Sequence, residues 1–343
     1  IPIGFLIVNQ QIDLSKKFII YWIIFSFLLI MPSIINLSSG RLGSDLINIK
    51  GLFSKWIFLS ALMLFFDTWL KKFKDNQLHQ LIYYLFLFFL PMITIIFFKV
   101  FAEVYECPKE LLDVRCRANP YGVGAFITSE LFLLFGLLCL PLKSNKIKFI
   151  LLTLTIIALI LLQARTALFA TILALAIYTF LPLIYKYKKK IIIPAALVTL
   201  ILCFYIFNYF VDNTFIGRHI STFTYRIHMW QLGLETIQAS PWFGIGFDVT
   251  PNYYSFTFNH HANTIHNMFI RIATENGLPL LIFITTTFIY SLYRVFQSKN
   301  FYAIAVILSV IIFHSFSTRH ISINLLNIIF YFIIMKSLYS FKK

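Results

Sequence analysis

The chain has 343 residues, of which 59% are apolar and only 12% are charged. A soluble domain of this length cannot bury so much apolar surface, so the composition excludes a soluble globular protein and predicts a membrane protein. The formal charge of +16 comes from short basic clusters between apolar runs. Because this pattern is typical of cytoplasmic loops, we expect no nucleic-acid partner.

Ten apolar runs are long enough, or nearly so, to cross the hydrocarbon core of a bilayer, which takes about 20 helical residues. Continuous runs of this kind exclude the alternating strands of a membrane β-barrel. The predicted fold class is therefore all-α, a polytopic bundle of about ten full transmembrane helices with a partial span at residues 1–8. The runs are Phe18–Ile35, Leu52–Leu70, Leu78–Phe101, Gly122–Leu142, Phe149–Gln163, Ala164–Tyr185, Ile191–Val211, Met268–Tyr293, Phe301–Phe316 and Ser322–Tyr339.

Basic clusters on alternate connections predict the orientation of the bundle. They lie at 16–17, 71–74, 143–148, 186–190, 294–299 and 342–343, and the positive-inside rule places them in the cytoplasm. Residues 212–265 are then a large outer loop between N-terminal membrane helices at 1–211 and C-terminal membrane helices at 266–343, within one integrated membrane domain. Basic residues at 41–55 do not fit this scheme.

One segment of the outer loop has helical spacing. Residues 224–238 place Ile227, Trp230, Leu234 and Ile237 near one face of a helix. Pro241 is predicted to end this helix and residues 244–246 to form a turn. We expect short helices lying over the outer membrane surface.

The four cysteines have no spacing typical of a zinc site. Cys107 and Cys116 fall in one outer connection, where oxidation is permitted, and whether they form a disulfide stays open. Cys139 and Cys203 lie in apolar runs and are interpreted as inert thiols.

Two arginines are candidates for binding phosphate. Arg165 stands alone between two apolar runs, where a guanidinium either snorkels to the membrane interface or grips phosphate oxygens in a two-pronged way. Arg226 precedes Trp230 by one helical turn, so a cation–π contact with the indole is the alternative to a functional role.

Three histidines, His260, His261 and His266, lie where the outer loop re-enters the membrane. A histidine that is half wet and half buried suits a general base. The alternatives are a purely structural residue and a zinc site made by the three imidazoles. Nine residues after His266, Glu275 is expected to pair with Arg271 across one helical turn.

These residues belong to an ordered set of motifs. Arg226-x-x-x-Trp230 is followed by Pro241-x-x-Gly-x-Gly246, and then by His266-Asn267 with Glu275-x-Gly-Leu278. The order resembles the signature of the O-antigen ligase and polymerase superfamily. Arg165-Thr-Ala resembles a further element, although Gln-Ala precedes the arginine where many relatives have serine. Arg117-Ala-Asn-Pro resembles another, so the resemblance runs from about Arg117 to the C-terminus.

The resemblance implies a glycosyltransferase of the bacterial inner membrane with its active site facing the periplasm. Family members pass a glycan from undecaprenyl diphosphate to an acceptor hydroxyl. We therefore predict O-antigen ligase-like transfer, with an undecaprenyl-diphosphate-linked glycan as donor, the lipid A core as acceptor and membrane lipids as surroundings. The alternatives are a polymerase that joins repeat units, a protein O-oligosaccharyltransferase and, from a different class, a lipid-oligosaccharide flippase. Transporters carry polar groups at mid-membrane, whereas Glu130 is the only acid well inside a predicted span.

The chemistry assigns a role to each motif side chain. Arg165 and Arg226 are predicted to hold the diphosphate while His266 deprotonates the acceptor, so that one displacement inverts the anomeric carbon. No metal and no cofactor are expected, because the arginines can stabilise the leaving group and the chain has no DxD-like acidic pair. Further substrate contacts are predicted for Arg319, His261, Asn267 and Arg117.

Overall fold

The computed structural model describes residues 16–38, 51–54, 56–57, 60–61, 75–105, 125–162, 164–187, 221–247, 265 and 267–315. These residues form helices and turns and contain no strand, which confirms the all-α class for the part of the chain they cover. The chain divides into two compact units. Unit 1 comprises Ile1–Phe73, Phe223–Gln297 and His314–Lys343, and unit 2 comprises Lys74–Thr222 and Ser298–Phe313.

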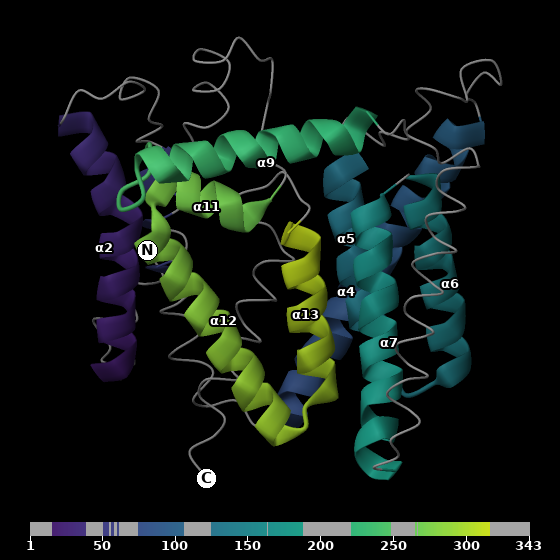
Figure 1. Cartoon of the computed structure of the whole chain (residues 1–343). Coiled ribbons are helices and arrows are strands. Elements are labelled where there is room, and N and C mark those ends of the chain that lie inside the picture. The colour runs from purple at the N-terminus through teal and green to yellow at the C-terminus, as the bar shows by residue number, and fades with distance from the viewer. Residues whose placement is uncertain are drawn as a thin grey trace. The chain divides into compact units, whose positions relative to one another are not determined.

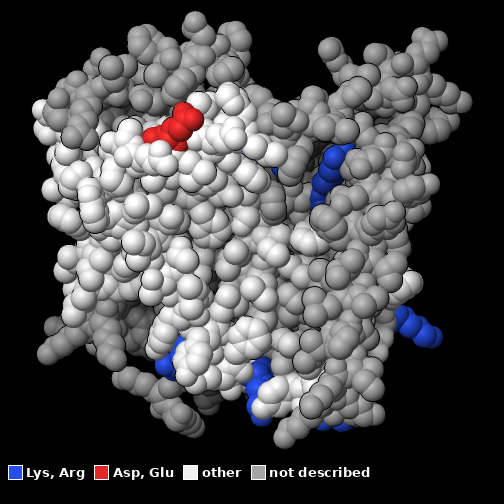
Figure 2. Space-filling model, viewed as in Figure 1, with Lys and Arg blue, Asp and Glu red and all other residues white. Residues whose placement is uncertain are grey.

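Four of the described helices are long and apolar enough to cross a membrane: Ile19–Ser38, Tyr83–Glu103, Arg165–Lys186 and Leu278–Ser298. Two shorter apolar helices, Thr128–Cys139 and Phe301–Ser315, accompany them. Most of the described surface in Figure 2 carries neither acidic nor basic side chains, as expected of a surface in lipid. The chain is thus a helical membrane protein. The full set of ten spans and the large outer loop include residues outside the described ones and stay predictions.

Unit 1 is built on two apolar helices, α2 (Lys16–Ser38) and α12 (Leu278–Ser298). They pack through Tyr21, whose hydroxyl hydrogen-bonds Thr287 Oγ1 at 2.8 Å and whose ring centroid lies 4.6 Å from that of Phe283. Two further helices, α9 (Ser221–Ala239) and α11 (Met268–Asn276), lie beside each other at the N-terminal end of α12 (Figure 1).

The prediction of one span over Met268–Tyr293 is wrong. The run is two helices, α11 and α12, separated at Gly277, which has a φ of 86°. This backbone conformation is left-handed and ends α11, because only glycine adopts it without strain. Pro279 then falls in the first turn of α12, where a missing amide hydrogen costs no helical hydrogen bond.

Unit 2 contains α4 (Asp75–Tyr105), α5 (Ala125–Cys139), α6 (Asn145–Leu161), α7 (Arg165–Tyr187) and most of α13 (Phe301–Ser315). Short turns join α5, α6 and α7, so α5 and α7 run in the same direction and α6 runs in the opposite one (Figure 1). The three helices meet at Gly136. A Cβ placed there would lie 3.2 Å from Thr171 Cγ2 of α7 and 3.3 Å from Thr155 Cγ2 of α6.

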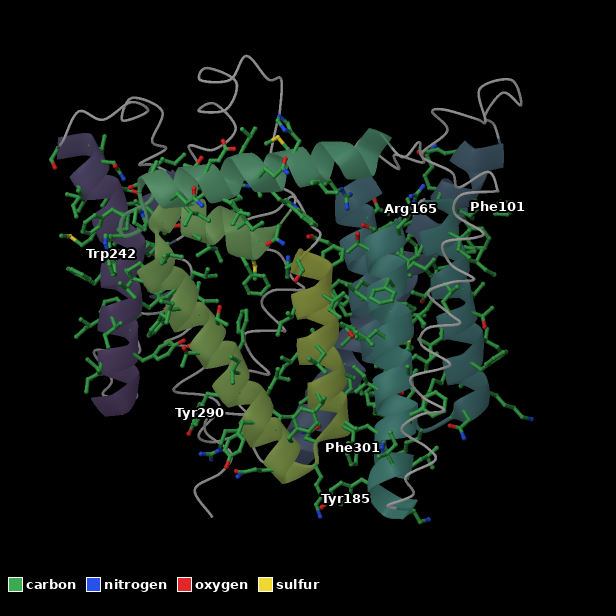
Figure 3. The ribbon with its side chains drawn as sticks, in the orientation of Figure 1. Phe101, Arg165, Tyr185, Trp242, Tyr290 and Phe301 are labelled. Carbon is green, nitrogen blue, oxygen red and sulfur yellow. The ribbon has the colours of Figure 1, made fainter. Side chains whose placement is uncertain are left out.

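Two lysines of unit 2, Lys148 and Lys299, lie at one end of these helices, whereas Lys99 lies near the C-terminal end of α4. Lys148, near the start of α6, lies with Nζ 5.5 Å from the ring centroid of Tyr178, and Lys299 lies 4.4 Å from that of Tyr185. Arg165 begins α7 at the opposite end from Tyr185 (Figure 3). The positive-inside rule assigns the end with Lys148 and Lys299 to the cytoplasm.

Candidate functional site

Helix α9 ends at Ala239, just before Pro241, and a tight turn follows, as predicted. The amide of Gly244 donates to the carbonyl of Ser240 at 3.0 Å, and the Ser240 hydroxyl donates back to the carbonyl of Gly244 at 2.8 Å. Gly244 and Gly246 have φ angles of 58° and 108°. The turn thus directs the amides of Ile245 and Gly246 away from α9 and towards α11.

Three backbone hydrogen bonds join this turn to the corner between α11 and α12. The amides of Ile245 and Gly246 donate to the carbonyls of Thr274 and Glu275 at 2.9 Å each, and the amide of Leu278 donates to the carbonyl of Pro241 at 2.7 Å. Carbonyls in the last turn of a helix lack a partner within that helix. The turn therefore caps α11. We call residues 241–246 together with residues 274–278 the backbone clamp.

Glycines make the close approach in the clamp possible. A Cβ on Gly277 would lie 2.2 Å from the carbonyl oxygen of Trp242, and a Cβ on Gly244 would lie 2.5 Å from that of Thr274. Both contacts are with backbone atoms, which cannot turn aside as a flexible side chain can. Any larger residue at either position must separate the two halves of the clamp.

Side chains of α2 and α11 add further bonds at the clamp. Asn36 Nδ2 donates to the carbonyls of Pro32 at 2.8 Å and of Gly244 at 3.2 Å. The Ser33 hydroxyl oxygen accepts from the amide of Phe247 at 3.2 Å, and Asn276 Nδ2 of α11 donates to a carbonyl of α2 at 3.2 Å. The clamp is therefore fixed to one of the apolar helices of unit 1.

The predicted pair of Arg271 and Glu275 is confirmed, but it is buried rather than solvated. Arg271 Nε lies 2.8 Å from Glu275 Oε1, and the two side chains are 6% and 0% exposed. Removing one partner of such a pair leaves a buried charge uncompensated and costs about 3–5 kcal/mol. The pair therefore holds α11 in place.

An apolar cluster packs α9 against the chain just before α11. Met229 and Leu232 of α9 are buried with Ile265, and Ile270 of α11 packs against them. Gly233 permits this contact, since a Cβ there would lie 2.5 Å from Ile270 Cγ2. The cluster fixes the neighbour of His266 in the chain against α9.

Arg226 of α9 lies one helical turn before Met229. Residues three apart share a face of a helix, so Arg226 stands on the side of α9 that packs towards Ile265. Its side chain is partly buried. Unit 1 therefore brings Arg226 towards the segment that contains His266.

Asn267 acts as the N-cap of α11. Its Oδ1 accepts hydrogen bonds from the amides of Phe269 at 2.9 Å and Ile270 at 3.1 Å. An asparagine at this position satisfies amides that have no partner within the helix. Its predicted role in substrate binding stays a prediction.

Of the remaining predicted site residues, Arg165 lies in unit 2 and the others lie outside the residues that the structure describes. Arg165 is partly buried at the start of α7, and its convergence with Arg226 stays a prediction. Residues outside the described ones are His266, His260, His261, Arg117, Arg319, Cys107, Cys116 and Cys203. The zinc alternative for the three histidines and the disulfide are therefore untested.

The model of the O-antigen ligase family matches residues 150–285. This segment is similar to that family. It contains the motifs that begin at Arg165, Arg226, Pro241, His266 and Glu275, whereas Arg117 and Arg319 lie outside it. No curated protein matches the chain. The family match confirms the resemblance and supports a glycosyltransferase-like membrane enzyme.

The predicted apolar face of α9 packs only in part: Trp230 lies against the cluster of Met229, Leu232 and Ile265. Ile227 and Leu234 are 39% and 51% exposed, while Met229, Leu232 and Thr236 are buried. The closest approach to α11 is at Gly233, which a search for large apolar residues overlooks. The clamp was also missed, although its three glycines, Gly244, Gly246 and Gly277, all stand in the motifs that resemble the O-antigen ligase family.

Proposed function

We propose that the chain passes a glycan from a lipid-linked diphosphate to a hydroxyl of the lipid A core, as an O-antigen ligase does. The observation that carries this proposal is the family match over residues 150–285. Within that segment Arg165, Arg226 and His266 occur in the family's order. These side chains supply two fixed cations and one base.

The proposed reaction is one displacement at the anomeric carbon. The acceptor oxygen bonds to that carbon, the bond from the carbon to the diphosphate oxygen breaks, and the acceptor proton passes to the imidazole of His266. Undecaprenyl diphosphate leaves with the bonding electrons. Arg165 and Arg226 stabilise its growing charge, so the product has inverted configuration and no metal is needed.

The packing of unit 1 supports a shared role for Arg226 and His266. Ile265 and Asn267, the neighbours of His266 in the chain, are held by the cluster with Met229 and by the cap of α11. Precise placement matters, because a base must reach the hydroxyl within hydrogen-bond distance. The backbone clamp and the buried ion pair give α11 the rigidity that such placement requires.

Charge supports an outward-facing site. In unit 2 Lys148 and Lys299 lie at the end opposite Arg165, and in unit 1 Arg294 lies near the C-terminal end of α12, opposite α11. The positive-inside rule assigns the basic ends to the cytoplasm. The ends that carry Arg165 and α11 are then periplasmic.

The test is a lipopolysaccharide gel of a deletion strain that expresses the chain or a variant. Arg165→Ala, Arg226→Ala and His266→Ala should remove all polymer from the core, with lipid-linked donor accumulating. In a purified assay His266→Ala should lower the transfer rate about 10²–10⁴-fold, the usual effect of a general base. His228→Ala, a histidine of α9 outside the proposed site, is the matched control and should transfer normally.

Three outcomes would contradict the proposal. A core that still carries one repeat unit in the deletion strain would identify a polymerase. A product that retains the donor's anomeric configuration would exclude one displacement. Strict dependence on an added divalent ion would exclude the metal-free scheme, whereas transfer in the presence of chelator supports it.

A further inference from the structure

Glu130 is a buried carboxylate inside the apolar helix α5. It is 3% exposed and follows Thr128 and Ser129, which are also buried. Other buried polar side chains of this unit bond to their own helix: the hydroxyls of Thr155 and Thr171 each donate to the carbonyl four residues before at 2.8 Å. An ionised carboxylate cannot do this, because it has no hydrogen to donate. A buried acid that stays ionised is stabilised by an opposite charge nearby.

The contact at Gly136 fixes the register between α5 and α7. Gly136 of α5 lies against Thr171 of α7, and the two helices run in the same direction. Glu130 is six residues before Gly136, and Arg165 is six residues before Thr171. At a rise of 1.5 Å per residue, both lie about 9 Å from this contact along parallel helices. Glu130 and Arg165 are therefore level, at the same end of the unit.

No other described cation of unit 2 lies at this level. Lys148 and Lys299 are at the opposite end, beside Tyr178 and Tyr185. The stacked rings of Phe86 and Phe135, 5.6 Å apart, set the register of α4 against α5. These helices run in opposite directions, so the position of α4 that is level with Glu130 is residue 91. Lys99 lies eight residues beyond that position, about 12 Å along the axis.

We propose that Glu130 is a positioning residue for Arg165. Its carboxylate holds one edge of the guanidinium, and the other edge stays directed at a phosphate group. Guanidinium has five donors in a planar fork, so it can serve both anions at once. This inference rests on the proposed function, in which Arg165 binds the donor diphosphate, and it assigns the acid that orients the arginine.

A purely structural role for Glu130 makes different predictions. Helix α7 starts after Ala164, whose side chain has no oxygen for an N-cap, so a carboxylate at this level could cap the first amides instead. A capping residue would change the melting temperature of the protein. It would leave the KM for the lipid-linked donor unchanged in the protein that remains folded.

The test measures donor KM, kcat and melting in detergent for Glu130→Gln, Glu130→Asp and Arg165→Ala. Glu130→Gln should lower kcat/KM for the donor about 10- to 100-fold, the effect of one charge-assisted hydrogen bond, mainly through KM. Glu130→Asp keeps the charge and should recover part of this loss. Glu130→Gln combined with Arg165→Ala should be no worse than Arg165→Ala alone, because coupled residues are non-additive.

The matched control is Glu103→Gln on α4, which removes an acid of the same unit and should leave donor KM unchanged. If Glu130→Gln does not fold, a normal donor KM in Glu130→Asp overturns the inference. Normal kcat/KM in Glu130→Gln, or additive losses in the double variant, also overturn it. Normal transfer by Arg165→Ala would instead contradict the proposed function, so the two failures are distinguishable.

Discussion

Replacing Gly277 by alanine should separate the two halves of the backbone clamp. The new Cβ would lie 2.2 Å from the carbonyl oxygen of Trp242 and 2.9 Å from the amide nitrogen of Phe243. It would also place alanine at a φ of 86° and a ψ of 169°, a region that only glycine adopts readily. That strain costs about 1–3 kcal/mol.

The lost hydrogen bonds add to this cost. Three backbone hydrogen bonds, of 2.7, 2.9 and 2.9 Å, join the two halves of the clamp. Each contributes about 0.5–1.5 kcal/mol net to stability. With the strain, Gly277→Ala should destabilise unit 1 by about 3–7 kcal/mol, a large part of the total stability of an ordinary domain. Transfer activity should fall as well, because α11 starts beside His266.

The assay is thermal melting of the detergent-purified protein, followed by size-exclusion chromatography. A loss of this size should lower the melting temperature by at least about 5 °C. Gly136→Ala is the matched control. Its Cβ would meet the methyl groups of Thr171 and Thr155 at 3.2 and 3.3 Å and the Thr171 hydroxyl oxygen at 4.0 Å. These atoms belong to side chains rather than to the backbone, and alanine gains about 1 kcal/mol in a helix, so the two effects nearly cancel. Equal melting of Gly277→Ala and wild type would refute the clamp.

Further predictions concern α9 and α11. Glu275→Ala should destabilise the protein by about 3–5 kcal/mol, since it removes the ion-pair partner of the buried Arg271. Chemical or thermal unfolding measures this loss. Loss of transfer activity without loss of stability would contradict the prediction. Asn267→Ala should lower the free energy of unfolding by about 1 kcal/mol through loss of the N-cap, whereas Asn267→Asp preserves the cap. An aspartate variant that is stable but inactive in a transfer assay would show that Asn267 also binds substrate. Gly233→Ala should weaken the packing of α9 on α11 by about 1–3 kcal/mol through overpacking, and unchanged melting would disprove that contact.

Much of the helical architecture was predictable, because long apolar runs have few structural solutions in a membrane. Helix α9 and its end before Pro241 followed from spacing and from proline chemistry. The break at Gly277 was not predicted, although Asn276, Gly277 and Pro279 interrupt the run Met268–Tyr293 and are signals of a helix boundary. The decisive factor is the left-handed backbone at Gly277, which is stabilised by contact with a turn more than thirty residues earlier.

The site was predictable in its residue types but not in its supports. The Arg271–Glu275 pair followed from helical spacing, yet its burial depends on packing that spacing does not encode. The packing face of α9 was missed because a glycine makes its closest approach to α11. Tertiary contacts between distant segments decide both, and a single sequence carries no direct record of them.

The clamp changes how the family motifs of this chain are interpreted. Pro241, Gly244 and Gly277 act through backbone geometry, so their presence in the motifs needs no catalytic role. Glu275 is fully buried against Arg271, which favours a packing role for it in the clamp. Of the motif residues that flank α11, His266 has the chemistry of the proposed general base, and the cluster of Met229, Leu232 and Ile265 holds its neighbour in the chain against α9.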